Sequence, residues 1–480
     1  MTDVREIKAD ICIIGAGSAG LSTAYAASNL GLKTVLFEAA DMGGDCLNHG
    51  CVPSKALLAA AKAAQNTRNL DPYGLSLDGK VKVDWARVRA HIAGTIATIA
   101  PVDSVERYES FGTIVIQEYA RFEDADTIVS ESCRVKAKRI VLATGSTAFV
   151  PPIPGLDTVD YLTNETIFTA SDFPEKLTIL GGGPIGIEMA QAFQRLGAEV
   201  TVIEMARALA RADADHAATA LKALRAEGVT ILEGHKATSI SGEAGHITVK
   251  TETDSGDGAA ISGTHLLVAL GRRPVIKGLD LEKANIATEK GHIAVKDTLQ
   301  SVSNSRVWAL GDVNGMAQFT HVAGHHAGIF TRAALMGLPG VKAGATALPA
   351  VTYMEPEIAQ LGLTEAEART EYGDKVRVGR FPFEENDRAI AERKTSGEVK
   401  IIWAGKKILG ASILGEAAGD LIQIVSVAMA NNLGPGGLIK HMSPYPTRAE
   451  AVKRAVSGSD SFGGRFFSST PIRTWIKWRH

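Results

Sequence analysis

The sequence predicts an α/β chain in which one strand–turn–helix unit occurs twice and a smaller α+β domain follows. Two observations support this prediction. An apolar strand, a glycine-rich turn and a helix follow one another from Ile11, and the same order recurs from Leu177. From about Leu348 the pattern changes to strands typical of an antiparallel sheet with helices around it.

Composition limits the class of protein. The chain has 480 residues, enough for about three domains. Its 51 Lys and Arg residues nearly balance its 53 Asp and Glu residues, so no basic footprint for nucleic acid is present. Neither an apolar run long enough to span a membrane nor an apolar leader occurs, and we expect a cytoplasmic protein. Four cysteines are too few for a disulfide scaffold.

The first unit has the pattern of a dinucleotide-binding site. Strand Ile11–Ile14 leads into a glycine-rich turn and a helix, and a second strand, Thr34–Phe37, ends at an acid. In such turns the first glycine allows a tight bend, the second lets the backbone approach a pyrophosphate, and the third lets helix and strand pack closely. The helix N-terminus faces phosphate, and the acid binds a ribose hydroxyl. The candidate residues are Gly15, Gly17, Ser18, Ala19, Gly20 and Glu38.

The second unit repeats this pattern with the same spacing. Glu38 follows Gly20 by 18 positions, and Glu204 follows Gly186 by 18 positions. Two copies, each with its acid, predict two Rossmann-like dinucleotide-binding domains and therefore two nucleotides in one chain. The candidate residues of the second site are Gly181, Gly183, Ile185, Gly186 and Glu204.

The second nucleotide-binding unit is expected to be inserted into the first. Apolar strands that end in glycine recur at Ile140–Gly145 and Leu266–Gly271, and a strand at about Val307 suits the first unit. The predicted domains are 1–150 (first part of the first unit), 151–280 (the inserted unit), 281–345 (second part of the first unit), 346–456 (the α+β domain) and 457–480 (a basic aromatic tail).

Two of the four cysteines lie five positions apart. A regular helix would hold the Cα atoms of Cys46 and Cys51 beyond the roughly 7 Å limit for a disulfide. The segment between them must therefore turn inward for the two to pair, and Gly50 permits this turn. The alternative is half of a metal site, but such a site needs partner ligands, and the sequence holds no second Cys pair. We predict a redox-active pair and no metal.

Taken together, these motifs resemble the flavin-dependent pyridine nucleotide–disulfide oxidoreductases, the family of dihydrolipoyl dehydrogenase, glutathione reductase and mercuric reductase. The resemblance runs from about Ala9 to Ala455. It rests on both glycine turns and the cysteine segment, and also on Thr144-Gly145, Gly271-Arg272, Gly311-Asp312 and Tyr445-Pro446-Thr447 with Glu450.

The resemblance implies FAD at the first glycine turn and NAD at the second. Glu38 would bind the adenosine ribose of FAD, and Asp312 its ribityl chain. Glu204 favours NAD because a carboxylate repels a 2′-phosphate, although Arg207 and Arg211 nearby keep NADP open. Further cofactor-binding residues implied by the family are Gly44, Asp45, Ala120, Thr144, Gly145, Gly271, Arg272 and Gly311.

The resemblance also assigns catalytic roles. Cys51 would be the thiolate next to the flavin, and Cys46 would exchange with the substrate. Lys55 would lie near the flavin ring and pair with Glu188, with a solvated helix face as the alternative for both. The family assembles as a homodimer in which the C-terminal domain reaches the partner's flavin, so a homodimer is expected.

The expected acid–base group departs from the family pattern. Dihydrolipoyl dehydrogenases and glutathione reductases carry a His-Pro pair with a Glu four residues after the proline, whereas this chain has Tyr445-Pro446 and Glu450. A phenol has an ordinary pKa near 10, against about 6.5 for imidazole, so at neutral pH Tyr445 can donate a proton but scarcely accept one. His441 is a second candidate for the base, or else a surface or interface histidine.

The predicted function is that of an FAD-dependent NAD(H) disulfide oxidoreductase of the dihydrolipoyl dehydrogenase type. Its substrate would be a dithiol or disulfide, such as a lipoyl group on a protein. One alternative is a mercuric-reductase-like enzyme or a reductase of metals or quinones, although no cysteine follows Cys133 to supply the second pair of mercuric reductases. The alternative from another class is a flavoprotein subunit that binds without catalysing.

The C-terminal tail holds four Arg and Lys residues and five Phe and Trp residues between Ser461 and His480, and no acid. We expect the tail to pack along its own dimer, with its aromatic rings in grooves. The alternative is peripheral contact with a membrane surface, which a basic aromatic segment also suits.

Overall fold

The computed structural model describes every residue except 1–3, 80, 345–346, 459–468 and 480. The chain folds into two compact units, each built from separate segments. Unit 1 contains Met1–Pro152, Asp160–Phe173 and Leu267–Ala345, and unit 2 contains Ile153–Val159, Pro174–Leu266 and Thr346–His480. The predicted α/β class is confirmed, while the bounds of the five predicted domains stay a prediction.

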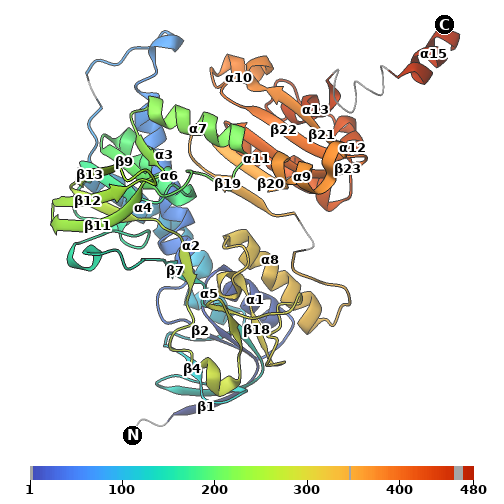
Figure 1. Cartoon of the computed structure of the whole chain (residues 1–480). Helices are drawn as coiled ribbons and strands as arrows, with labels where there is room; N and C mark the ends of the chain where they lie inside the picture. The colour runs from blue at the N-terminus through green and yellow to red at the C-terminus, as the bar shows by residue number, and fades with distance from the viewer. Residues whose placement is uncertain (1–3, 80, 345–346, 459–468, 480) are drawn as a thin grey trace. The chain divides into compact units, whose positions relative to one another are not determined.

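A seven-stranded sheet forms the centre of unit 1 (Figure 1). Five of its strands run parallel, and β4 and β5 form an antiparallel edge. The order is β3–β2–β1–β6–β5–β4, with β18 also paired to β6. The bounds are β1 (Arg5–Ile14), β2 (Thr34–Phe37), β3 (Ile114–Ile116), β4 (Arg121–Phe122), β5 (Thr127–Val129), β6 (Cys133–Leu142) and β18 (Val307–Ala309).

The burial of strand β1 shows that this sheet is covered on both faces. Residues 11–14 are all buried, as expected of a parallel strand that is covered on both faces. The strand is longer than the predicted Ile11–Ile14, because Ile7 and Ala9 alternate with more exposed residues and extend the pairing with β6. This alternation is a strand signal that the apolar run alone did not include.

Helices and short strand pairs complete unit 1. Its helices are α1 (Ser18–Asn29), α2 (Gly44–Asn48), α3 (Cys51–Asn66), α4 (Trp85–Ile99), α5 (Val105–Ser110) and α8 (Thr320–Phe330). Two-stranded ribbons form between β7 (Ser146–Ala148) and β15 (Arg272–Pro274), and between β16 (Thr288–Glu289) and β17 (His292–Ile293).

Unit 2 contains three sheets. A four-stranded sheet has the order β10 (Thr230–Glu233), β9 (Glu199–Glu204), β8 (Lys176–Leu180) and β14 (His265–Val268). A five-stranded antiparallel sheet has the order β19 (Pro349–Thr352), β20 (Glu357–Gly362), β23 (Lys407–Gly415), β22 (Glu398–Ala404) and β21 (Val376–Pro382). The helices are α6 (Pro184–Leu196), α7 (Ala214–Ala226), α9 (Glu365–Tyr372), α10 (Asp387–Ala391), α11 (Ala418–Ala430), α12 (Pro435–Lys440), α13 (Glu450–Ser457) and α15 (Thr470–Arg479).

The third sheet of unit 2 was not predicted from the sequence. It is an antiparallel meander of β11 (Lys236–Glu243), β12 (His246–Glu252) and β13 (Gly258–Gly263). In β12 the buried Ile247, Val249 and Thr251 alternate with more exposed residues, so a period-two signal was present in the sequence.

A buried ion pair joins α7 to the five-stranded sheet within unit 2. Lys400 on β22 is only 1% exposed, and its Nζ lies 2.7 Å from Asp213 Oδ1 and 3.0 Å from Asp215 Oδ2. Asp213 also caps α7 by accepting from the backbone N–H of His216. A buried cation of this kind is tolerated only because its charge is paired.

We expect Lys400→Ala to lower the free energy of unfolding by about 3–5 kcal/mol, because it leaves the Asp213 carboxylate buried and unpaired. The double variant Lys400→Met with Asp213→Asn removes both charges and should recover most of this loss. Denaturant unfolding of the purified protein measures both, with the exposed Lys407→Ala as the control. Equal unfolding of Lys400→Ala and Lys407→Ala would contradict the role of the pair.

Candidate active site

The carboxyl ends of four parallel strands bring the first predicted site together in unit 1. Gly15 follows β1, Glu38 follows β2, Thr144 follows β6 after one residue, and Gly311 follows β18 after one residue. Because these strands are parallel, their carboxyl ends meet at one edge of the sheet, where α/β proteins bind ligands.

The first glycine turn forms a cradle. Backbone contact is so close at Gly20 that a Cβ would lie 1.8 Å from the carbonyl oxygen of Gly15. Gly44 approaches the same turn from the cysteine segment, where its Cβ would lie 2.7 Å from Gly17 Cα. Glu38 Oε2 accepts a hydrogen bond from the N–H of Ala16 at 2.6 Å, which places the acid beside the turn. The residues therefore fit a pyrophosphate and its ribose.

The second glycine turn in unit 2 has the same construction. A Cβ at Gly186 would lie 2.0 Å from the Gly181 carbonyl oxygen, whereas a Cβ at Gly183 would meet nothing within 4 Å. Glu204 Oε2 accepts from the N–H of Gly182 at 2.8 Å, matching the contact between Glu38 and Ala16. The open position at Gly183 suits the approach of a second dinucleotide.

The two cysteines meet across a break between helices. Helix α2 ends at Asn48 and α3 begins at Cys51, so the predicted interruption of the helix is present. A Cβ at Gly50 would lie only 3.0 Å from the carbonyl oxygen of Asp45, which explains the glycine at the inward turn. Both cysteines are free thiols, and they are hydrogen-bonded to each other.

The hydrogen bond makes the two sulfurs chemically different. The pKa of Cys51 is lowered to about 6, chiefly because the Cys46 thiol donates to it, with smaller contributions from the Thr320 hydroxyl and the positive charge of Lys55. For the same reason, and because it is partly buried, the pKa of Cys46 is raised. Cys51 is therefore the thiolate at neutral pH and Cys46 the thiol. Thr320 at the start of α8 lies 3.4 Å from Cys51 Sγ and was not predicted from the sequence.

A polar chain links the cysteine segment to the sheet edge. Asp45 Oδ1 pairs with Arg272 Nη2 at 3.2 Å, and Arg272 Nε donates to Ser146 Oγ at 2.8 Å. Ser146 Oγ in turn donates to Asp312 Oδ2 at 2.6 Å. Burial raises the pKa of Asp312. The structure thus brings together three predicted residues and one, Ser146, that the sequence did not reveal.

Comparison with known proteins settles the family. The family profile "Pyridine nucleotide-disulphide oxidoreductase" matches residues 9–327, and its dimerisation domain matches residues 348–456. This chain belongs to the pyridine nucleotide-disulfide oxidoreductases. Members of this family of flavoprotein disulfide reductases use FAD and NAD(P)H, so the predicted cofactor classes are confirmed. The matched dimerisation domain supports the expected homodimer.

Several relatives cover nearly all of the chain. Mercuric reductase of Bacillus cereus is 34% identical over 451 residues, which are 93% of this chain and 71% of that protein. Dihydrolipoyl dehydrogenase of Rhizobium etli is 34% identical, over 95% of this chain and 98% of that protein. The solved Cu(II) complex of the HOCl-induced flavoprotein disulfide reductase RclA from Escherichia coli has a TM-score of 0.82 and 28% identity, over 92% of this chain and 98% of that one.

Other residues that the family resemblance selected have defined contacts in unit 1. Thr144 Oγ1 donates to the carbonyl of Val275 at 2.6 Å, and the N–H of Gly311 donates to His326 Nδ1 at 3.1 Å. Burial lowers the pKa of His326 to about 4, so this ring stays neutral and holds the Gly311 turn as an acceptor. Ala120 is buried in the core, which leaves only its backbone for a cofactor.

Lys55 and Glu188 lie in different units, and their pairing stays a prediction. Lys55 Nζ donates to Ser54 Oγ at 3.3 Å. Glu188 is 5% exposed on α6, and its Oε1 accepts from the N–H of Tyr353 at 2.9 Å. The role expected for both residues at the flavin ring also stays a prediction.

Tyr445, the residue expected at the acid–base position, is held by a carboxylate. Its hydroxyl donates to Asp387 Oδ2 at 2.6 Å, and this hydrogen bond raises the pKa of Tyr445.

The other two candidates near Tyr445 have partners of their own. Glu450 begins α13 and accepts from Arg454 Nε at 3.1 Å. The His441 ring lies between the Leu438 carbonyl and Ser443 Oγ, both at 2.7 Å. Asp387, which accepts the hydrogen bond of Tyr445, lies 58 positions earlier in the chain and was not predicted from the sequence.

Within the described residues, no three His, Cys, Asp or Glu side chains gather as a metal site. None of the described helices is both long and apolar enough to cross a bilayer.

The pKa of Cys51 should depend on the donor at position 46. Cys46→Ser keeps an O–H donor, whereas Cys46→Ala removes it, so we expect the pKa of Cys51 to be about one to two units higher in Cys46→Ala. The pH dependence of iodoacetamide alkylation of Cys51 in the FAD-loaded protein measures this. The two remaining cysteines, Cys12 and Cys133, are buried and should react slowly. The same pKa in both variants would contradict the assignment.

Proposed function

We propose that this chain is an NADH-dependent reductase that passes electrons through Cys46 and Cys51 to a thiol-reactive acceptor and oxidises dihydrolipoyl groups poorly. The observation that carries the proposal is the 2.6 Å hydrogen bond from Tyr445 to Asp387, which keeps the phenol protonated. A base is needed to take a proton from an attacking dithiol, and a phenol with a raised pKa does not supply one.

The proposed binding residues follow from the two cradles. Gly17, Gly44, Glu38 and Asp312 would hold FAD, which when bound relays electrons between nicotinamide and the cysteine pair. In unit 2, the turn from Gly181 to Gly186 would hold the nicotinamide dinucleotide. The Glu204 carboxylate beside that turn supports NAD over NADP, because it repels a 2′-phosphate.

In the proposed direction the cysteine pair begins reduced, with Cys46 as the thiol and Cys51 as the thiolate. Cys46 sulfur attacks one sulfur of the acceptor disulfide while its proton moves to Cys51, and the acceptor's S–S bond breaks. Cys51 sulfur then displaces the acceptor from Cys46, and its proton passes to the departing sulfur. The Cys46–Cys51 disulfide is formed, and the acceptor gains two electrons and leaves as two thiols after one further proton from water. Tyr445 stands at the position where the resemblance places the acid–base group, and it would donate a proton to a departing thiolate.

A thiophilic metal ion is the second candidate acceptor. It is favoured by relatives named mercuric reductases and by the neighbour solved as a Cu(II) complex. Because no cysteine follows Cys133 in this sequence, only Cys46 and Cys51 would meet such an ion.

Comparing both directions of turnover tests the proposal. Under anaerobic conditions, NADH should reduce the bound flavin and the cysteine pair, and NADH oxidation should be sustained by lipoamide, another disulfide, or Hg(II) or Cu(II). NAD reduction by dihydrolipoamide should be much slower. The Cys46→Ser variant is the control and should lose turnover while keeping FAD. Fast dihydrolipoamide oxidation by the native enzyme would sink the proposal.

Replacing Tyr445 by His should raise dihydrolipoamide oxidation near neutral pH, because a positioned general base is typically worth about 10²–10⁴-fold. Replacing it by Phe should slow disulfide reduction if the phenol donates its proton. Steady-state rates in both directions, with FAD content measured beside them, check the result. If neither substitution alters either rate, Tyr445 lies outside the chemistry.

A further inference from the structure

We propose that α15 (Thr470–Arg479) is an interfacial helix that binds the surface of an anionic lipid bilayer. The helix carries three positive charges, on Arg473, Lys477 and Arg479, and no acid. The whole chain, by contrast, has a net charge of −2. Positive charge is therefore concentrated at one end of an otherwise balanced protein.

The helix separates apolar from polar side chains. At 100° per residue, one half of its circumference carries Pro471, Ile472, Trp475, Ile476 and Trp478, with Arg479 among them at the last turn. The other half carries Thr470, Arg473, Thr474 and Lys477. A helix with an aromatic apolar face and a basic polar face has the pattern of segments that lie in a membrane interface.

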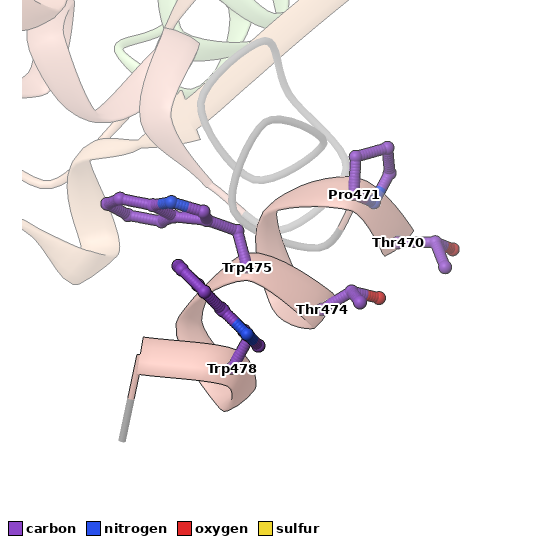
Figure 2. Close-up of a pocket in the computed structure, with 5 residues that line it drawn as sticks. All are labelled: Thr470, Pro471, Thr474, Trp475 and Trp478. Carbon is purple, nitrogen blue, oxygen red and sulfur yellow. The ribbon is translucent and has the colours of Figure 1, made fainter.

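The apolar face is exposed. No side chain of α15 is buried, and Trp475 and Trp478 are 53% and 83% exposed. Figure 2 shows both indole rings projecting from the same side of the helix, and they line an open hollow together with Thr470, Pro471 and Thr474. Tryptophan is enriched at the level of lipid headgroups, because its ring is apolar and its N–H is polar.

Arg479 in the last turn also supports binding to a lipid surface. The Arg479 guanidinium lies 5.3 Å from the centre of the Trp475 ring. This cation–π contact keeps a positive charge next to the indole, so that the ring can enter the headgroup region while the charge stays at the level of the phosphates. Anionic headgroups supply the complementary charge for all three cations.

Length limits how the helix can bind. Ten residues make a helix about 15 Å long, half of the roughly 30 Å needed to span a bilayer, so α15 can lie on the surface but not cross it. A single short anchor binds weakly. A homodimer, which the matched dimerisation domain supports, carries two copies of α15, and binding of both copies to one vesicle would strengthen the attachment.

Sedimentation of the holoenzyme with vesicles tests this proposal. The enzyme should bind vesicles of phosphatidylcholine mixed with phosphatidylglycerol, bind pure phosphatidylcholine vesicles much less, and dissociate in high salt. Two double variants, Trp475→Ser with Trp478→Ser and Arg473→Gln with Lys477→Gln, should lower the vesicle-bound fraction. For the charge variant we expect at least about a tenfold weaker partition, since each basic residue near an anionic surface contributes about fivefold.

The control is the charge-matched double variant Lys222→Gln with Lys236→Gln, which changes exposed residues elsewhere in unit 2 and should bind like the native enzyme. NADH turnover should be the same in all of these proteins, because none of the changed residues belongs to the proposed active site. Absence of vesicle binding by the native enzyme, or equal binding by the α15 variants, would overturn the proposal. If the native enzyme does not bind vesicles and the variant Trp475→Ser with Trp478→Ser loses dimerisation or thermal stability, the helix packs on its own dimer.

Discussion

The close approach of backbone at the third glycine of each turn is the constraint on which the two nucleotide-binding cradles depend. A Cβ at Gly20 or Gly186 would fall within 2.0 Å of a carbonyl oxygen of its own turn. Only glycine lets the helix begin directly against the strand, and that contact aims the helix N-terminus at the edge where the strands end. In both copies the acid at the end of the next strand accepts from the N–H of the second residue of the turn. The sequence repeat is therefore also a repeat of hydrogen bonds.

The reactivity of the cysteine pair depends on the break between α2 and α3. Because the helix stops before Cys51, the two sulfurs come close enough for Cys46 to donate to Cys51, and this bond is the largest cause of the depressed Cys51 pKa. Asp45 opposes the effect through its negative charge, but it is paired with Arg272 at 3.2 Å. Through Arg272 and Ser146, the same ion pair reaches Asp312 at the sheet edge. Asp45 thus ties the redox pair to the polar residues at the sheet edge of unit 1.

The features that the sequence predicted well depend on residues close together in the chain, whereas the contacts that it missed join residues far apart in the chain. The two glycine turns, the strands before them, the acids after them and the helix break at Gly50 each follow from residues within about 20 positions. Thr320 lies 269 positions from Cys51, and Asn164 lies 119 positions from the Asp45 that it contacts. Such partners are brought together by the tertiary fold, so spacing in one sequence cannot reveal them. The meander β11–β13 is different, because its alternating pattern was present and was passed over.

The direction proposed for the reaction follows from two opposite shifts in proton affinity. The Cys46 hydrogen bond lowers the pKa of Cys51 to about 6, while Asp387 raises the pKa of Tyr445 above the ordinary value of about 10. Between these limits the reduced protein has one thiolate, one thiol and one neutral phenol. The Cys51 thiolate is lost as the pH falls through about 6, and the phenol keeps its proton throughout the neutral range. The reduced protein in this state has a thiolate at Cys51 and protons on Cys46 and Tyr445. Such an arrangement suits delivery to an acceptor better than deprotonation of an incoming dithiol.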